Sequence, residues 1–191
     1  MKMIHEITSN EVVIKNSRFI CILFPLLDDK IDSYLQQVKE EYPKATHYCY
    51  AYQFDQVKHS SDDGEPGGTA GMPLLNVLEK EGLNHTLVVV VRYFGGIKLG
   101  AGGLVRAYTK SLTETLKISL FDELEDGYQI QISFPYEEEK NVNYLLGNSL
   151  ITKKDYLENI TYTCFVNFDL YDKILPYHPL ILEKCIIKKT P

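Results

Sequence analysis

The stretch LVVVVRYFGGIKLGAGGLVRAY, residues 87–108, carries the clearest fold signal in this chain of 191 residues. It begins with an apolar run that has no polar alternation, as expected of a strand covered on both faces. A glycine-rich turn follows, and apolar residues then recur at every fourth position from Leu104 to Leu116. The stretch therefore predicts the central strand of a sheet, a tight turn and a long helix.

The segments before this stretch predict further strands and helices. Ile4 to Ile14 and Arg18 to Phe24 are rich in β-branched and aromatic residues and predict a hairpin around Lys15-Asn16-Ser17. Thr46 to Phe54 predicts another strand. Two helices are also expected. The first is capped by Asp28 or Asp29, has its apolar positions between Ile31 and Tyr42 and stops at Pro43, and the second runs from Pro73 to Gly82.

The last third of the chain predicts a second domain. The acidic stretch Asp122 to Gly127 separates it from the long helix, and strict alternation from Tyr128 to Phe134 predicts its first strand. The order that follows is β-α-β-β-α-β, which fits a small ferredoxin-like domain. We therefore expect an α+β protein with a first domain over residues 1–125 and a second over residues 126–191.

Composition narrows the function classes. Hydrophobic residues make up 45% and charged residues 24% of the chain, which is typical of globular proteins. The net charge of −6 means that any nucleic-acid contact must come from a local basic face. No apolar run is long enough to span a bilayer, and the four scattered cysteines predict reduced thiols. These features favour a cytoplasmic protein without a membrane anchor.

An acidic turn is the first candidate site. Asp62, Asp63 and Glu65 lie among Gly64, Pro66 and further glycines, so the backbone must turn sharply there. Three interpretations stay open: carboxylates that cap the following helix, oxygen ligands for Mg²⁺, and a general acid or base.

The glycine-rich turn is the second candidate site. Its glycines, among them Gly100, Gly102 and Gly103, precede a helix N-terminus and surround Lys98, which suits an anion cradle of backbone N–H groups. The spacing matches neither a P-loop nor a dinucleotide fingerprint. Close packing of the helix on the strand is the structural alternative. The anion interpretation is favoured by the nearby cations, which are Arg92, Lys98, Arg106 and Lys110.

Other candidate side chains lie at the ends of predicted strands. Tyr93 and Phe94 follow the apolar run, where aromatic rings either cover the core or offer a stacking platform for bases, and covering the core is the more frequent role. His47 lies on a strand face and has a side chain suited to acid–base chemistry or to ligand binding.

Four segments together resemble the YigZ/IMPACT family over about residues 1–120. They are Lys15 to Ile20, Ala45-Thr46-His47 with Ala51, Ser61 to Pro66 with Gly68-Thr69-Ala70-Gly71 and Pro73, and Val91 to Tyr108. The resemblance implies that the first domain has the fold of the second domain of a ribosomal small-subunit protein. It also implies that the second domain is similar to a ferredoxin-like domain of elongation factor G.

The resemblance further implies a link with translation, through protein contacts in eukaryotic relatives and through a proposed nucleic-acid or ribosome role in bacterial members. We therefore expect a regulatory or binding protein that contacts RNA, the ribosome or a translation factor through the two loops. The ligand-binding residues of this hypothesis are His47, Asp62, Asp63, Glu65, Arg92, Tyr93, Lys98, Gly100, Gly102, Gly103, Arg106 and Lys110. The alternative is a phosphotransferase or hydrolase that holds Mg²⁺ at Asp62, Asp63 and Glu65.

Overall fold

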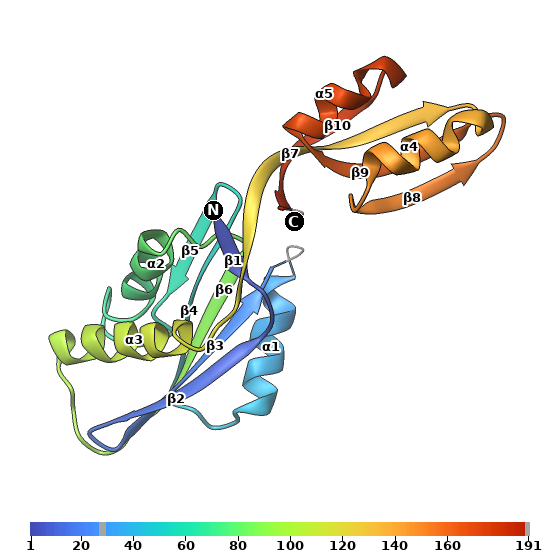
Figure 1. The fold of residues 1–191 in the computed structure, drawn as a ribbon. Coiled ribbons are helices and arrows are strands. Elements are labelled where there is room, and N and C mark those ends of the chain that lie inside the picture. The colour runs from blue at the N-terminus through green and yellow to red at the C-terminus, as the bar shows by residue number, and fades with distance from the viewer. Residues whose placement is uncertain (27–29, 190–191) are drawn as a thin grey trace. The chain divides into compact units, whose positions relative to one another are not determined.

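The computed structural model describes residues 1–26 and 30–189. The chain divides into two compact units, Met1–Asp122 and Glu123–Pro191. Figure 1 shows each unit as a sheet with helices packed on it. The predicted cap residues Asp28 and Asp29 lie outside the described residues.

The first unit is built on a five-stranded antiparallel sheet with the order β2-β3-β6-β4-β5. The strands are β2 (Thr8–Ile14), β3 (Ser17–Pro25), β4 (His47–Phe54), β5 (Val57–Ser61) and β6 (Thr86–Tyr93). The apolar run predicted to be central lies within β6, which has two strands on each side, and Leu87 to Val91 are fully buried. The prediction from the apolar run is therefore confirmed.

Helices cover both faces of this sheet, as Figure 1 shows. They are α1 (Ile31–Glu41), α2 (Gly71–Lys80) and α3 (Ala101–Leu116). Val38 of α1 packs in one apolar cluster with Val89, whereas Leu74 of α2 and Leu112 of α3 pack in another with Val88. Alternate residues of β6 thus enter different cores, which explains why its sequence has no polar alternation.

Two details of the first unit differ from the sequence prediction. The predicted strand from Ile4 to Ile14 is interrupted, because β1 (Lys2–Ile4) bonds through Lys2 to the backbone of Gly82 and Asn84 instead of continuing into β2. Strand β5 was missed, because its sequence VKHSS is polar and mostly exposed at the sheet edge. Its register is set by pairing with β4.

The second unit has the predicted order β-α-β-β-α-β. Its elements are β7 (Phe121–Phe134), α4 (Glu139–Leu146), β8 (Ile151–Tyr156), β9 (Ile160–Asn167), α5 (Phe168–Ile174) and β10 (Leu180–Lys188), with short 3₁₀ turns η1 (Tyr136–Glu138) and η2 (Leu175–Tyr177). Among these elements β10 pairs with β7, β7 with β9 and β9 with β8, which gives the order β10-β7-β9-β8, and all three pairs are antiparallel. The core combines Ile130 and Ile132 of β7 with Val142 of α4 and Ile174 of α5.

The sequence suggested that the acidic stretch from Asp122 to Gly127 separates two elements, but the structure shows that it does not. It forms the first half of β7, because β10 pairs with it from Lys188↔Leu124 to Cys185↔Gly127. Backbone pairing with a distant strand therefore overrides the loop-like composition.

Two further findings concern the described chain as a whole. Among its residues, no helix is both long and apolar enough to cross a membrane. The cysteines are all thiols, as expected, and Cys21, Cys49 and Cys164 are buried.

Candidate functional site in the first unit

Strand pairing brings the acidic turn and the end of β6 together. In the register of β4 and β6, His47 lies opposite Arg92. The acidic turn follows β5, which pairs with the other edge of β4 through Tyr50↔Ser61. Residues far apart in sequence therefore meet at one end of the sheet.

Glu65 is the centre of a buried polar cluster. Its Oε1 accepts hydrogen bonds from Nη1 of Arg92 at 2.5 Å and from the hydroxyl of Tyr108 at 2.8 Å. The side chains of Arg92 and Glu65 are only 6% and 3% exposed. The Arg92 guanidinium also lies over the rings of Phe19 and Phe94. Because the charges neutralise each other, the pair can be buried without leaving a net charge in the core.

Tyr108 joins this cluster to the centre of the sheet. Its ring packs edge-on against Phe19, and its hydroxyl accepts a hydrogen bond from the Cys49 thiol at 3.2 Å. Burial, together with Cys49 and Glu65, raises the pKa of Tyr108 far above its ordinary value. Burial likewise raises the pKa of Cys49 to about 12. Both groups stay neutral at physiological pH, so neither supplies a nucleophile.

Asp62 caps the N-terminus of helix α2 directly, although it lies in the acidic turn several residues before the helix. Its Oδ1 accepts from the backbone N–H groups of Ala70 and Gly71 at 2.9 and 2.8 Å, and its Oδ2 accepts from that of Gly68 at 2.7 Å. Burial acts to raise the pKa of Asp62, but these backbone donors outweigh it and hold the pKa below its ordinary value. Of the three interpretations of the acidic turn, helix capping is the one that the contacts of Asp62 support.

His47 and Asp63 fix the turn to strand β4. Oδ2 of Asp63 accepts from the backbone N–H of Tyr48 at 2.6 Å, and the Asp63 carbonyl lies 2.8 Å from Nδ1 of His47. Because a carbonyl oxygen only accepts, Nδ1 of His47 carries the hydrogen. Nε2 of His47 then lies 3.8 Å from Oε2 of Glu65.

The predicted Mg²⁺ ligands do not fit a common metal site. Asp62 is occupied by backbone donors, Asp63 by the Tyr48 amide, and Glu65 by Arg92 and Tyr108. Within residues 1–26 and 30–189, no group of three or more His, Cys, Asp or Glu side chains is arranged to hold a metal ion. No step of a reaction is therefore assigned to Mg²⁺.

The glycine-rich loop is anchored at its start. The Phe94 amide donates to the Thr46 hydroxyl at 3.0 Å, and the Gly95 amide donates to the Ser17 hydroxyl at 3.1 Å. A Cβ at position 95 would collide with the backbone of Asn16 and Ser17, so only glycine fits there. Close packing, the structural alternative, thus explains Gly95.

The other end of the loop is open. Gly100 has a φ of 71°, a conformation that favours glycine, and Cβ atoms at positions 96 and 100 would meet no neighbouring atom within 4 Å. The first helical hydrogen bond of α3 runs from the Leu104 amide to the Gly100 carbonyl. In the described chain the amides of residues 101–103 have no acceptor, which is the usual state of a helix N-terminus.

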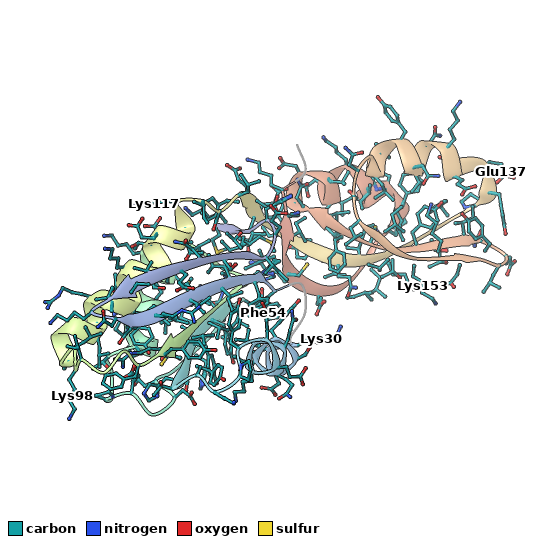
Figure 2. All side chains as sticks on the ribbon, turned by 90° about the horizontal axis from the view of Figure 1, so that it is seen from below. Lys30, Phe54, Lys98, Lys117, Glu137 and Lys153 are labelled. Carbon is teal, nitrogen blue, oxygen red and sulfur yellow. The ribbon has the colours of Figure 1, made fainter. Side chains whose placement is uncertain are left out.

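The predicted cations fall into two groups. Arg92 is buried and paired with Glu65, whereas Lys98, Arg106 and Lys110 are exposed. Arg106 and Lys110 are one helical turn apart on α3, and a Cβ at Gly102 would lie 3.8 Å from Nη1 of Arg106. Figure 2 shows the Lys98 side chain extending away from the ribbon. We refer to Lys98 of the loop and to Gly102, Arg106 and Lys110, which follow one another at every fourth position of α3, as the basic stripe.

The structure therefore joins part of the predicted site and leaves the rest apart. His47, Asp62, Asp63, Glu65 and Arg92 form connected contacts, and within residues 1–26 and 30–189 no hydrogen bond or ion pair links them to the basic stripe. Sequence reasoning missed Tyr108 and Cys49, because their spacing marked them only as residues of a helix stripe and a strand face. The alternation in β4 and the apolar spacing in α3 indicate only that Cys49 and Tyr108 face the core. Tertiary packing then places the Tyr108 hydroxyl against Glu65 and the Cys49 thiol against that hydroxyl.

The two aromatic residues at the end of β6 also differ. Tyr93 packs against the apolar cluster under α1, and its hydroxyl donates to the Pro43 carbonyl at 3.2 Å. Phe94 is 47% exposed. The more frequent role, covering the core, thus applies to Tyr93 but not to Phe94.

The fold and the site define a class: an α+β protein of two units in which a buried carboxylate–guanidinium–phenol cluster lies beneath an acidic turn and a basic, glycine-rich loop opens a helix. The chain belongs to the YigZ/IMPACT family, and the model of the Impact N-terminal domain matches residues 15–116. This match ends with α3.

The chain is similar to several members of this family and to a solved structure. It is 49% identical to the IMPACT family member YvyE of Bacillus subtilis over 117 residues, which are 59% of this chain and 54% of that protein. It is 35% identical to the IMPACT family member YigZ of Escherichia coli over 153 residues, 75% of this chain and 74% of that protein. The match to YvyE therefore spans about half of that relative.

A crystal structure described as that of a hypothetical protein resembles nearly the whole chain. Its TM-score is 0.71 at 28% identity, and the match covers 95% of this chain and 97% of that one. The likeness therefore extends over both units.

Proposed function

We propose that this chain is a translation-associated regulatory or binding protein that contacts RNA, on the ribosome or free, through the basic stripe. Membership of the YigZ/IMPACT family supports the link with translation. We also propose that the first unit has the fold of the second domain of a ribosomal small-subunit protein. For the second unit we propose a ferredoxin-like fold, which the strand order β10-β7-β9-β8 supports.

The RNA proposal rests on which basic side chains of the first unit are paired with a carboxylate and which are not. Arg92 is neutralised by Glu65, whereas no carboxylate of residues 1–26 or 30–189 lies within ion-pair distance of Lys98, Arg106 or Lys110. The hydrogen bond from Lys117 lowers the pKa of Glu114, one turn further along α3 than Lys110, and the charge of Lys110 contributes to this shift. Lys98 precedes the N-terminus of α3, where backbone N–H groups and the helix dipole favour a negative ligand, and Arg106 and Lys110 follow on the second and third turns of the helix. On a chain with a net charge of −6, such a local stripe is where phosphate contacts would form.

The test is binding of a labelled single-stranded oligoribonucleotide, measured by fluorescence anisotropy at several salt concentrations. Affinity is expected to fall with added salt, with a slope of roughly 0.7 per phosphate contact. Arg106→Glu and Lys110→Glu are expected to weaken binding and to reduce the slope. Lys140→Glu, the same charge change on the exposed side of α4, serves as the matched control and should bind like the parent.

Two outcomes would overturn the proposal. One is binding that does not depend on salt, and the other is equal loss in Lys140→Glu and Arg106→Glu. If Arg106→Glu leaves RNA binding intact but abolishes capture of a translation factor, the stripe is a protein-docking surface instead.

A further inference from the structure

An exposed tyrosine patch lies at one end of the second unit. It consists of Tyr136, Tyr156 and Leu157, whose exposed fractions are 50%, 51% and 78%. The rings of Tyr136 and Tyr156 lie 6.5 Å apart. Large side chains this exposed and this close together are typical of interaction sites rather than of ordinary surface.

Hydrogen bonds hold the patch in place. The Tyr136 hydroxyl donates to the Leu157 carbonyl at 2.9 Å, and the Tyr156 hydroxyl donates to Oε1 of Glu139 at 3.0 Å. Oε1 of Glu139 also accepts from the buried Tyr162 at 2.9 Å. The bonds to Tyr162 and Glu139 raise the pKa of Tyr156 to about 12, so its ring stays neutral. Rings held in this way lose little conformational entropy when a partner binds.

The surroundings of the patch are acidic. The two segments that form it, residues 135–139 and 155–160, contain Glu137, Glu138, Glu139, Asp155 and Glu158 but no lysine or arginine. Figure 2 shows the Glu137 side chain at this end of the unit.

Three lysines flank the two segments, and one of them pairs with Asp155: Nζ of Lys153 lies 2.7 Å from its carboxylate. Lys154 lies over the ring of Tyr162 at 4.4 Å, and Lys140 is exposed at the end of the first segment. In the described part of the chain, the glutamates of the two segments form no ion pair, and Glu138 accepts from Asn141 and Tyr177 instead. The glutamates, unlike Asp155, are therefore without an ion-pair partner in the described part of the chain, and a basic segment from outside would supply one.

We propose that the tyrosine patch binds a basic segment of a protein partner, with arginine or lysine side chains over the rings of Tyr136 and Tyr156 and beside the glutamates. Aromatic faces attract cations, and arginine in particular stacks on them. Carboxylates beside the rings add complementary charge and repel phosphate. RNA is therefore disfavoured here, and this surface is distinct from the basic stripe of the first unit.

The experiment measures binding of a fluorescein-labelled arginine-glycine repeat peptide to the whole chain at near-neutral pH. Tyr136→Ala and Tyr156→Ala are each expected to weaken binding about two- to fivefold, the range for an exposed cation–π contact. Tyr156→Phe keeps the ring and is expected to bind nearly like the parent. The matched aromatic control is Tyr144→Ala, since Tyr144 is 87% exposed on α4 and outside the patch.

Charge is tested separately. Glu137→Gln is expected to weaken peptide binding, whereas Glu6→Gln, which removes an exposed carboxylate from the first unit, should leave it unchanged. The proposal is overturned if Glu137→Gln and Glu6→Gln weaken peptide binding equally. It is also overturned if Tyr136→Ala and Tyr156→Ala both bind like the parent, since either result would show non-specific attraction to an acidic chain. Competition of the labelled oligoribonucleotide for this patch would overturn it as well. Because no variant of this set touches the basic stripe, failure here leaves the RNA proposal standing.

Discussion

Glu65 in the first unit and Glu139 in the second both accept hydrogen bonds from tyrosine hydroxyls, yet their surroundings are opposite. Glu65 is buried, bonds to Tyr108 and is neutralised by Arg92 at 2.5 Å. Glu139 bonds to Tyr156 and Tyr162 at the edge of an exposed patch and has no cationic partner in the described chain.

The difference between Glu65 and Glu139 separates polar groups that stabilise the fold from polar groups that remain available to bind a ligand. A buried carboxylate needs a compensating charge and hydrogen bonds, so Glu65 and Arg92 are paired with each other and are not available to a ligand. A carboxylate near solvent needs no such partner, so Glu139 keeps its charge at the surface. The same contrast separates Arg92 from Lys98, Arg106 and Lys110. Charged residues that the sequence groups together therefore have different roles.

The largest effect is expected from Glu65→Gln. Removing one partner leaves the Arg92 guanidinium buried without its countercharge, which costs roughly 3–5 kcal/mol of unfolding free energy. Chemical denaturation measures it. A loss below about 1 kcal/mol would show that water or relaxation compensates Arg92 and that the cluster is not a rigid part of the core.

Tyr108→Phe tests the same cluster more gently. The variant removes the hydroxyl that donates to Glu65 and accepts from Cys49 while keeping the ring against Phe19. We expect a loss of roughly 1.5–3 kcal/mol, the range for a hydrogen bond to a charged group, because Glu65 loses one of its two donors. The Cys49 thiol keeps the Asp62 carbonyl as an acceptor. Tyr156→Phe, its counterpart at the exposed patch, should leave the denaturation midpoint unchanged. Equal effects in the two variants would contradict the contrast between the clusters.

Asp62 provides a third kind of compensation, by backbone donors instead of a cation. Asp62→Ala removes the cap of α2 and is expected to cost roughly 0.5–2 kcal/mol near neutral pH. Because the folded pKa lies below the ordinary value of 3.8, this stabilisation is present above that value and is lost as the pH falls through the folded pKa. Denaturation of parent and variant as a function of pH should show the two curves converging in acid. A constant gap at all pH values would argue against the cap.

The smallest effect is expected from Glu139→Gln. The amide oxygen of glutamine still accepts from Tyr156 and Tyr162, so the unfolding free energy should change by less than about 0.5 kcal/mol. Thermal unfolding monitored by circular dichroism measures it. A loss as large as that of Glu65→Gln would mean that Glu139 is part of the fold and is not reserved for a partner.

Local signals predicted the elements that carry strong periodicity. The apolar run in β6, the every-fourth spacing of α3 and the order of the second unit all appear as expected. Strand β5 and the acidic half of β7 were not predicted, since both are strands only because a distant strand pairs with them. The two segments predicted to be turns lie between regular elements, as expected. The sequence alone could not tell which of their charged residues are paired inside the fold and which stay exposed, because that depends on distances between residues far apart in the chain.

The amino-acid sequence by itself determined the central strand, the long helix after a glycine-rich turn, and the local gathering of acids and cations in two loops. Hydrophobic spacing and glycine content act over a few neighbouring residues, so they can be read from the chain directly. Only the tertiary structure decided that Glu65 belongs to Arg92 and Tyr108, that Asp62 caps α2, and that the tyrosines at the end of the second unit stay exposed. Those outcomes depend on which strands pair and on which side chains lose contact with water, and both are settled by contacts between residues far apart in sequence.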